Sequence, residues 1–436
     1  MSERWARTVL AAYRFAGAAA FPLVGPYVAW RATKGKEDPT RRYERSGYAG
    51  KPRPEGPLIW AHAASVGETI AIVPLIESIL GYGVNVVLTT GTVTSAQVAE
   101  ERLGDSIIHQ FVPLDLKPAI GRFLNHWQPD LAIIAESEIW PMTIMELGYR
   151  RIPQVLVNGR LSERSFQSWK KRANIAEALF ENLSHVVAQS EVDAERFEAL
   201  GARPVTVSGN LKVDTNPPPV DGRALHAISR QLSLRPTWAA VSTHEGEERM
   251  AAEIHLMLRS RHPGLLTIIV PRHPERAAAL ADEFAAMGLR SVTRSSGDRI
   301  RSDTDILLGD TIGEMGLYLR LTEIAFVGRS LTAEGGQNPL EPAMLETAVL
   351  AGRNVQNFRE AYQRLIDGGA AKLVANRDML AGAVNFLLLN DATRRKMMAA
   401  GAATVEDMRG ALGKTLKALE PFIHPLVVKA RLKGVR

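Results

Sequence analysis

Residues 58–80 read LIWAHAASVGETIAIVPLIESIL, and this stretch decides the class of fold. Its first six residues are apolar apart from His62 and predict a short buried strand. A polar loop follows, and residues 69–80 then repeat apolar side chains at helical spacing. A strand followed at once by a helix is the repeating unit of an open parallel sheet, so this stretch predicts an α/β protein.

The same strand-then-helix unit recurs on both sides of one break in the chain. Asn216 is followed by three prolines, a semi-rigid segment that predicts a linker. We expect an α/β protein with two domains, residues 54–215 and 216–436, which bind ligands in a cleft at the carboxyl ends of their parallel strands. The expected strands are 58–63, 84–90, 131–135, 154–157, 186–188 and 205–207 before the break, and 238–242, 265–270, 305–308, 323–327 and 348–351 after it.

Composition and charge exclude several classes of protein. The 436 residues are 46% hydrophobic and 23% charged, which is typical of a soluble globular protein and not of a disordered or polytopic membrane protein. The absence of cysteine excludes disulfide scaffolds, thiolate metal sites and cysteine nucleophiles. The net charge of +6 lies at the ends, because residues 1–53 carry +7 and residues 425–436 carry +4. Basic ends on an acidic body indicate an anionic membrane surface rather than nucleic acid.

The N-terminal residues 1–53 are the candidate membrane anchor with its basic juxtamembrane segment. Residues 8–30 contain one charged side chain, Arg14, and the uncharged part would form a helix of about 24 Å, short of the roughly 30 Å of a hydrocarbon core. We expect Pro22 and Pro26 to kink this helix. The basic residues that follow would place the rest of the chain on the cytoplasmic side. The alternatives are a buried core helix and a cleaved signal peptide.

Charged side chains collect just after the expected strands of the first half. Glu68 enters the helix after the first strand, where it is either a general base or a first-turn residue that complements the helix dipole. Glu136 and Glu138 follow a later strand, and two neighbouring carboxylates are costly unless something binds them. The alternative is one capping and one surface glutamate. Lys212 is either an anion partner or a solvated lysine.

Four loops of the second half together predict a nucleotide site. An arginine at a strand end before a helix suits a phosphate, glycines admit a ligand close to the backbone, and Asn and Glu side chains could hold ribose hydroxyls. The first of these loops could on its own be a plain capping box. Neither the P-loop motif nor G-x-G-x-x-G occurs, which argues against P-loop ATPases and NAD enzymes. The loops are Ser242–Glu248, Pro271–Arg276, Gly309–Met315 and Gly335–Pro342.

No metal site is expected. Asp303 and Asp305 have the D-x-D spacing of metal-dependent glycosyltransferases, but no supporting acidic residues surround them. His244 and His273 lack a partner at metal-ligand spacing. We therefore expect neither a divalent cation nor a zinc ion.

As a set, these motifs resemble those of the 3-deoxy-D-manno-octulosonic acid (Kdo) transferase family over nearly the whole chain. The family moves Kdo from CMP-Kdo to the lipid A precursor (lipid IVA) in lipopolysaccharide core biosynthesis. The resemblance implies an inverting GT-B glycosyltransferase with two Rossmann-like domains facing a cleft, no metal or other cofactor, and an anchor helix that holds the catalytic domains on the cytoplasmic side of the inner membrane. The motifs are His62–Glu68, Glu136–Pro141, Asn158–Leu161, Gly209–Lys212, Pro271–Arg276, Gly313–Met315 and Asn338–Pro342.

The resemblance also implies a role for each site residue. Glu68 matches the general base that takes the proton of the acceptor hydroxyl, and Glu138 and Lys212 match positions that stabilise the transition state, with Glu136 as the alternative to Glu138. Another GT-B lipid glycosyltransferase, a UDP-sugar epimerase, or a membrane-tethered nucleotide-binding protein without catalysis are the competing hypotheses. The CMP site would be formed by Arg272, His273, Gly313, Glu314, Met315, Asn338, Pro339, Leu340 and Glu341.

Overall fold

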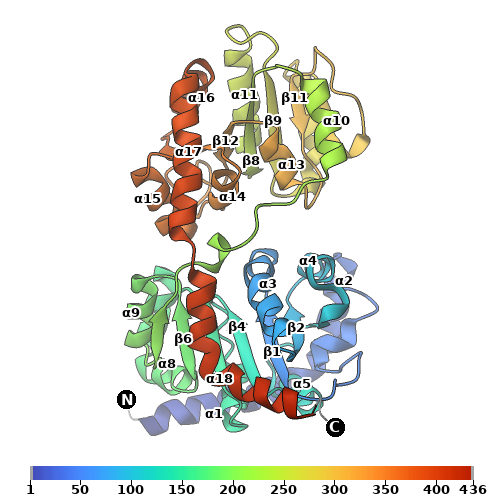
Figure 1. The fold of residues 1–436 in the computed structure, drawn as a ribbon. Coiled ribbons are helices and arrows are strands. Elements are labelled where there is room, and N and C mark those ends of the chain that lie inside the picture. Colours follow the sequence, from blue (N-terminus) through green and yellow to red (C-terminus); the bar gives the residue numbers. More distant parts are fainter. Residues whose placement is uncertain (1–2, 434–436) are drawn as a thin grey trace. The chain divides into compact units, whose positions relative to one another are not determined.

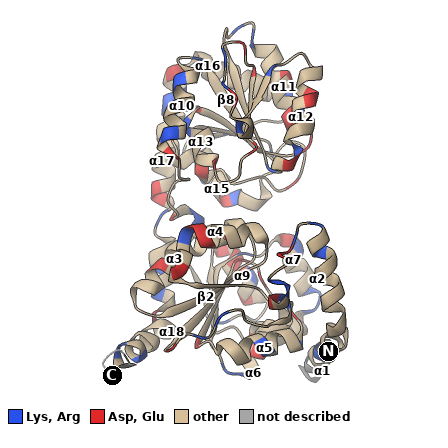
Figure 2. Cartoon of the chain, turned by 90° about the vertical axis from the view of Figure 1, so that its right-hand side faces the viewer, with Lys and Arg blue, Asp and Glu red and all other residues tan. Residues whose placement is uncertain are grey.

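A computed structural model describes residues 3–433, which form two compact units (Figure 1). Unit 1 comprises residues up to Thr215 together with the segment from Arg409, and unit 2 comprises Asn216–Met408. Each unit contains a seven-stranded sheet whose neighbouring strands all pair in parallel, as the alternation of strands and helices predicted. The strands themselves are almost free of charged residues in both units (Figure 2), so the charged side chains lie on helices and loops.

The sheet of unit 1 has the strand order β3-β2-β1-β4-β5-β6-β7. The chain leaves β1 toward one edge of the sheet and returns at β4 on the other side of β1, so the loops after β1 and β4 diverge from a common point. In open parallel sheets this reversal of strand order is where ligands bind. The strands are β1 Leu58–Ala63, β2 Asn85–Thr90, β3 Ile108–Phe111, β4 Leu131–Ala135, β5 Gln154–Gly159, β6 His185–Ala188 and β7 Val205–Val207.

Both faces of this sheet are buried by apolar side chains. Along β1, Ile59 and Ala61 face one cluster while Leu58 and Trp60 face the other, as the two-residue period of a strand requires. The helices of unit 1 are α1 Glu3–Ala20, α2 Val24–Thr33, α3 Val66–Gly81, α4 Val93–Leu103, α5 Lys117–Trp127, α6 Pro141–Tyr149, α7 Glu163–Lys170, α8 Ala173–Phe180, α9 Glu191–Ala199 and α18 Ala411–Lys433. Side chains of α3, α4 and α18 contribute to the first cluster, and those of α5, α6, α8 and α9 to the second.

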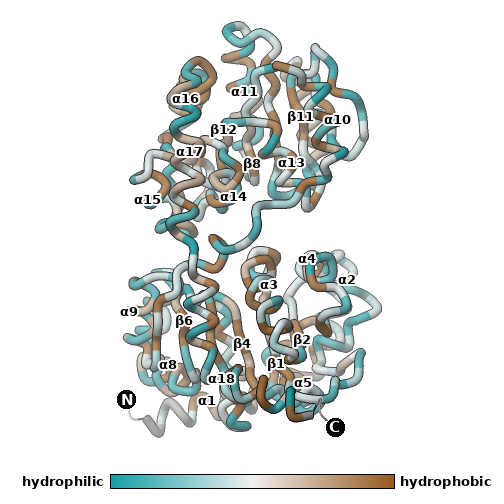
Figure 3. Tube along the Cα trace, viewed as in Figure 1, coloured by the Kyte–Doolittle hydropathy of each residue, from teal (hydrophilic) through white to brown (hydrophobic). Residues whose placement is uncertain are grey.

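The sheet of unit 2 has the strand order β10-β11-β9-β8-β12-β13-β14, with the same reversal, here between β8 and β12. Its strands are β8 Thr237–Thr243, β9 Leu266–Pro271, β10 Ser291–Thr293, β11 Ile306–Leu308, β12 Ile324–Val327, β13 Ala348–Ala351 and β14 Ala371–Leu373. Its helices are α10 Gly222–Leu232, α11 Glu247–Leu258, α12 Ala277–Ala286, α13 Met315–Arg320, α14 Leu340–Met344, α15 Arg359–Asp367, α16 Arg377–Leu389 and α17 Asp391–Met408. The central strands of both sheets are strongly hydrophobic (Figure 3), which matches their complete burial.

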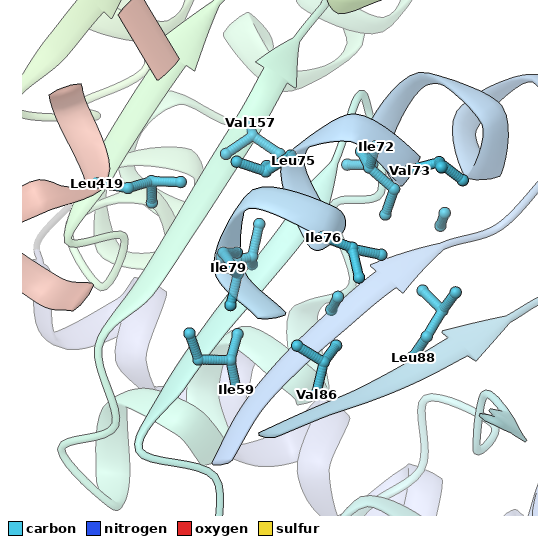
Figure 4. Close-up of a cluster of buried hydrophobic side chains, with 14 of the residues drawn as sticks. Ile59, Ile72, Val73, Leu75, Ile76, Ile79, Val86, Leu88, Val157 and Leu419 are labelled. Atoms are coloured by element: carbon cyan, nitrogen blue, oxygen red, sulfur yellow. The ribbon is translucent and has the colours of Figure 1, made fainter. Parts of the chain in front are cut away.

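The expectation that residues 216–436 form the second domain was wrong at its C-terminal end. Helix α18 packs on unit 1, where Leu419 is fully buried on the same face of the sheet as the side chains of α3 (Figure 4). The start of this segment is also held there, because the carboxylate of Asp214 accepts hydrogen bonds from the backbone N–H groups of Gly410 (2.8 Å) and Leu412. An apolar stripe on α18 therefore completes the core of unit 1.

The N-terminal segment forms two helices separated by a short 3-10 turn, Phe21–Leu23, which contains Pro22, so the expected interruption of the helix is present. Within the described residues one stretch, Thr8–Thr33, has the length and apolar composition needed to cross a membrane, and 11% of its most apolar window is buried. Arg14, the one charge expected in this stretch, pairs with the buried Glu146 at 2.9 Å. The helix is therefore attached to unit 1 along one side.

Some of the basic residues after this helix pair with acids of the same segment, whereas Lys34, Lys36 and Arg42 are exposed. Arg45 is buried and pairs with Glu37 at 2.8 Å, and Arg31 pairs with the same carboxylate at 2.7 Å. Arg41 pairs with Glu44 at 2.8 Å. These ion pairs lie within the segment and neutralise several of its charges, while Arg45 also donates to the backbone oxygens of Gly91 and Val112 of unit 1.

Candidate active site

Glu68 lies at the beginning of α3, directly after β1. Its carboxylate accepts hydrogen bonds from the Ala64 backbone N–H at 2.7 Å and from the Ser65 hydroxyl at 2.9 Å, and Ser65 caps the helix. The alternative interpretation of Glu68, a residue that stabilises the first turn of the helix, is therefore part of its role. Burial raises the pKa of Glu68, and the negative charges of Glu136 and Glu138 raise it further. A fixed carboxylate with a raised pKa at a strand end has the properties of a general base.

Glu136 follows β4 with a φ of 54°, in the left-handed region that non-glycine residues rarely adopt. It forms an ion pair with Lys212 and accepts a weaker hydrogen bond from Asn158 at 3.4 Å. Asn158 also has a positive φ, of 53°, and its amide oxygen accepts the backbone N–H of Leu211 at 2.9 Å. Two residues with a strained backbone, Glu136 directly after β4 and Asn158 in the adjacent β5, thus contact the segment that carries Lys212. Backbone strain of this kind is often found in functional sites.

Glu138 is placed differently from Glu136, although only one residue separates them. Its carboxylate accepts a hydrogen bond from the Trp140 indole at 2.5 Å, and the same oxygen lies 3.9 Å from Nε2 of the buried His62. Lys212 forms an ion pair with Glu136. The structure therefore separates the two glutamates that the sequence could not rank: Glu136 holds the lysine, and Glu138 faces the histidine.

The sequence-predicted residues of unit 1 thus come together at the point where the strand order reverses. Glu68 is supplied by α3, Glu138 by the loop after β4, and Lys212 by the 3-10 turn Leu211–Val213. Lys212 lies beside the first turn of α3, since a Cβ added at Gly67 would be 3.9 Å from its Nζ. His62 also lies beside this group, and the sequence assigned it no role because a lone histidine inside an apolar strand is usually a core residue.

In unit 2, the expected donor-site residues lie at the carboxyl ends of neighbouring strands. Arg272 follows β9, and its backbone N–H donates to Thr243 of the adjacent β8 at 2.9 Å. His273 is half-exposed and lies edge-on to His244, with ring centroids 5.8 Å apart. His244 in turn contacts the Gln337 amide at 3.1 Å, which connects these loops to the loop that carries the next predicted residues.

The loop at Asn338–Glu341 is organised by its own side chains. The Asn338 oxygen accepts the Leu340 N–H at 3.1 Å, and its amide donates to Glu341 at 3.3 Å. Pro339 and the buried Leu340 begin α14, so their side chains shape the loop rather than offering polar contacts. The Asn338 and Glu341 side chains remain the polar groups of this loop, as the sequence indicated.

The backbone conformation of the loop at Gly313–Met315 accounts for its glycine. Gly313 has a φ of +84°, and no atom lies within 4 Å of the position of a Cβ, so the left-handed backbone requires glycine there and crowding does not. Glu314 accepts a hydrogen bond from Arg294 at 2.8 Å and another from the Thr311 hydroxyl. Met315 is the first residue of α13. This loop follows β11, next to β9 in the sheet.

Glu247 is a central residue of unit 2 that the sequence did not reveal. Its buried carboxylate accepts four backbone N–H groups: that of His244, and those of Arg329, Ser330 and Leu331 after β12, at 2.7–3.1 Å. It therefore fixes the loops at both strands of the reversal point. From spacing alone this acid could be read only as a capping residue.

The residues Asp303 and Asp305 have structural roles. Asp305 accepts the Arg290 backbone N–H at 2.9 Å and contacts the buried His255 at 3.1 Å, while Asp303 forms an ion pair with Arg290. No group of three or more potential metal ligands occurs among the described residues.

Comparison with known proteins shows similarity over the whole architecture. The family described as 3-deoxy-D-manno-octulosonic-acid transferase (kdotransferase) matches residues 40–215. The chain is 35% identical to 3-deoxy-D-manno-octulosonic acid transferase of Haemophilus influenzae over 92% of this chain and 96% of that protein. It is also 35% identical to the enzyme of the same name from Bordetella pertussis, over 88% and 91%. A glycosyltransferase structure from Rickettsia africae matches 85% of this chain and 99% of that chain with a TM-score of 0.59 and 13% identity, which shows the fold alone.

Proposed function

The chain belongs to the 3-deoxy-D-manno-octulosonic acid (Kdo) transferase family, and we therefore propose that it transfers Kdo from CMP-Kdo to the lipid A precursor, with Glu68 as the general base. It is a glycosyltransferase with the GT-B fold, and its relatives from Haemophilus influenzae and Bordetella pertussis are named 3-deoxy-D-manno-octulosonic acid transferases. The observation that carries the mechanistic part is the cluster of Glu68, Glu138 and Lys212 at the reversal point of the unit 1 sheet.

The properties of Glu68 support its assignment as the base. An inverting transfer needs a carboxylate that removes the proton of the attacking hydroxyl while the Kdo–phosphate bond breaks. Burial and the two neighbouring acids raise the pKa of Glu68, and a stronger base is more effective at proton removal as long as it is ionised. Lys212 supplies positive charge close to it, which suits a donor that carries both a phosphate and a carboxylate.

The donor is assigned to unit 2. Its CMP would be held by Arg272 and His273, by the start of α13 at Gly313–Met315, and by the loop Asn338–Glu341. A leaving group with one phosphate can be neutralised by a cationic side chain and backbone N–H groups, so no divalent metal is required. The residues offered by these loops are of the types that such a site needs.

The N-terminal helices support the proposed acceptor and location. Phe15, Leu23 and Trp30 are apolar side chains that are more than half exposed, and they give α1 and α2 a surface suited to lipid. We assign the enzyme to the inner membrane with both units on the cytoplasmic side. A phosphorylated, acylated disaccharide held in the bilayer would then be presented to the unit 1 site.

The test is an assay of the full chain with CMP-Kdo and lipid A precursor, in which CMP release and the mass of the lipid product are measured. We expect Glu68→Gln to lose turnover by about 10²–10⁴-fold while CMP binding is unchanged, because only the proton acceptor is removed. Glu77→Gln, on the exposed side of the same helix, is the matched control and should keep full activity. Release of UDP from a UDP-sugar instead of CMP would overturn the proposed donor, and full turnover of Glu68→Gln would overturn the role of Glu68.

A further inference from the structure

The ring of His62 is fixed in one orientation inside the sheet of unit 1. His62 lies in β1 opposite Thr89 of β2 and is 1% exposed. Its Nδ1 lies 3.0 Å from the backbone oxygen of Thr89 and 2.9 Å from the Thr89 hydroxyl. A carbonyl oxygen only accepts hydrogen bonds, so Nδ1 must carry a proton. In a neutral imidazole Nε2 would then be a bare acceptor.

The other ring nitrogen faces the active site. Nε2 of His62 is buried, has no hydrogen-bond partner among the described residues, and lies 3.9 Å from the Glu138 carboxylate. A neutral ring would present a lone pair to a carboxylate oxygen, which is repulsive, and would leave a buried acceptor unsatisfied. A protonated ring removes the repulsion and gives Nε2 a proton that Glu138 can accept once the two groups approach.

Several charged side chains lie at this site. The charged groups of this site are Glu68 from α3, Glu136 and Glu138 from the loop after β4, and Lys212 from the turn after β7. Lys212 is already paired with Glu136. Among these four groups the carboxylates outnumber the lysine, and a Kdo donor would bring further negative charge. A second cation at His62 reduces this excess at Glu138.

We propose that His62 is a positioning residue that works as an imidazolium, with Nδ1–H anchored to Thr89 and Nε2–H holding the Glu138 carboxylate in place for the reaction. To close the 3.9 Å gap to the roughly 2.8 Å of a charge-assisted hydrogen bond, the Glu138 side chain must rotate, and the oxygen that accepts the Trp140 indole must then be shared between Trp140 and His62. The proton comes from solvent, and no bond to the substrate is made or broken by His62. The part of this inference that concerns catalysis rests on the proposed Kdo transfer.

Two substitutions separate positioning from structural support. The Asn amide reaches the position of Nδ1, so His62→Asn keeps the anchor to Thr89 and loses the contact to Glu138. The Gln amide reaches the position of Nε2, so His62→Gln keeps a donor for Glu138. We expect kcat/KM for CMP release to fall by about 10–100-fold in His62→Asn, by less than about 10-fold in His62→Gln, and hardly further when His62→Asn is added to Glu138→Gln. An active His62→Asn variant, or equal losses in both variants, would overturn the proposal.

A spectroscopic measurement keeps the two proposals distinguishable. In the full chain labelled with ¹⁵N-histidine, the signal that disappears in His62→Gln identifies the ring. We expect both of its nitrogens to be protonated at pH 7, and only Nδ1 to be protonated in Glu138→Gln. A neutral ring in the unaltered chain would overturn the ion pair whatever the activity is. If the unaltered chain releases no CMP from CMP-Kdo, the proposed function fails, while the state of the ring still decides the pairing of His62 with Glu138.

Discussion

Replacement of Glu247 by Gln tests how the reversal point of unit 2 is held together. One carboxylate oxygen accepts the N–H groups of His244 and Arg329, and the other accepts those of Ser330 and Leu331. A glutamine has nearly the same shape but only one acceptor oxygen. Its amide NH₂ would face two N–H donors, so two buried backbone groups would lose their partners.

The expected loss of stability follows from the number of backbone N–H groups that lose their partner. Each buried donor without a partner costs about 1–3 kcal/mol, so Glu247→Gln should lower the free energy of unfolding of unit 2 by about 2–6 kcal/mol. With a urea m-value of about 2 kcal/mol/M, the midpoint should fall by about 1–3 M. Glu245→Gln is the matched control, because this exposed glutamate lies two residues away. It should change the stability by less than about 0.5 kcal/mol.

Hydrogen exchange measured by mass spectrometry reports directly on the protection of the backbone N–H groups in the loop after β12. Peptides that contain Arg329, Ser330 and Leu331 should lose protection in Glu247→Gln and keep it in Glu245→Gln, and the same samples in urea give the midpoint. If the two variants exchange equally fast and unfold at the same urea concentration, the four hydrogen bonds do not hold the loop, and the argument for Glu247 is refuted.

Three further predictions concern the active site and the core. Burial and the charges of Glu136 and Glu138 raise the pKa of Glu68, so activity should fall as the pH drops through that raised value. Glu138→Gln removes one negative charge and should move this acid limb of the kcat/KM profile to lower pH. An unmoved limb would show that the two carboxyl groups are not coupled. Leu419→Ala should destabilise unit 1 by about 2–5 kcal/mol in thermal or urea unfolding, because the Leu419 side chain is fully buried. Leu432 is 69% exposed, so Leu432→Ala should have almost no effect. Equal stabilities of the two variants would exclude α18 from the core. EDTA should leave turnover with CMP-Kdo unchanged, and a requirement for added Mg²⁺ would return Asp303 and Asp305 to consideration as ligands.

The strands that the sequence did not reveal are edge strands. β3, β10 and β14 each end a sheet and are three or four residues long. Their side chains are only partly buried, so they lack the continuous apolar run that marked the central strands. The placement of α18 was missed for a related reason. Its apolar stripe shows that it packs on something, but the stripe alone does not say which of two similar sheets it covers.

The candidate site could be predicted where its charged residues lie in short segments directly after strands. Glu68, Glu138 and Lys212 follow strands, and the ends of parallel strands meet at one edge of a sheet. The difference between Glu136 and Glu138 depends on a positive φ at Glu136, which turns neighbouring side chains toward different partners. The contact of His62 with Glu138 depends on the pairing of β1 with β2 and β4, which a lone histidine in a strand does not disclose.

The return of α18 to unit 1 makes unit 2 an insertion within a larger unit, which has a consequence for biosynthesis. All residues of unit 2, up to Met408, leave the ribosome before α18 does. Unit 2 can therefore fold while the sheet of unit 1 still exposes the apolar face that Leu419, Ile423 and Val427 later cover. During translation the unit that is begun first is therefore completed last.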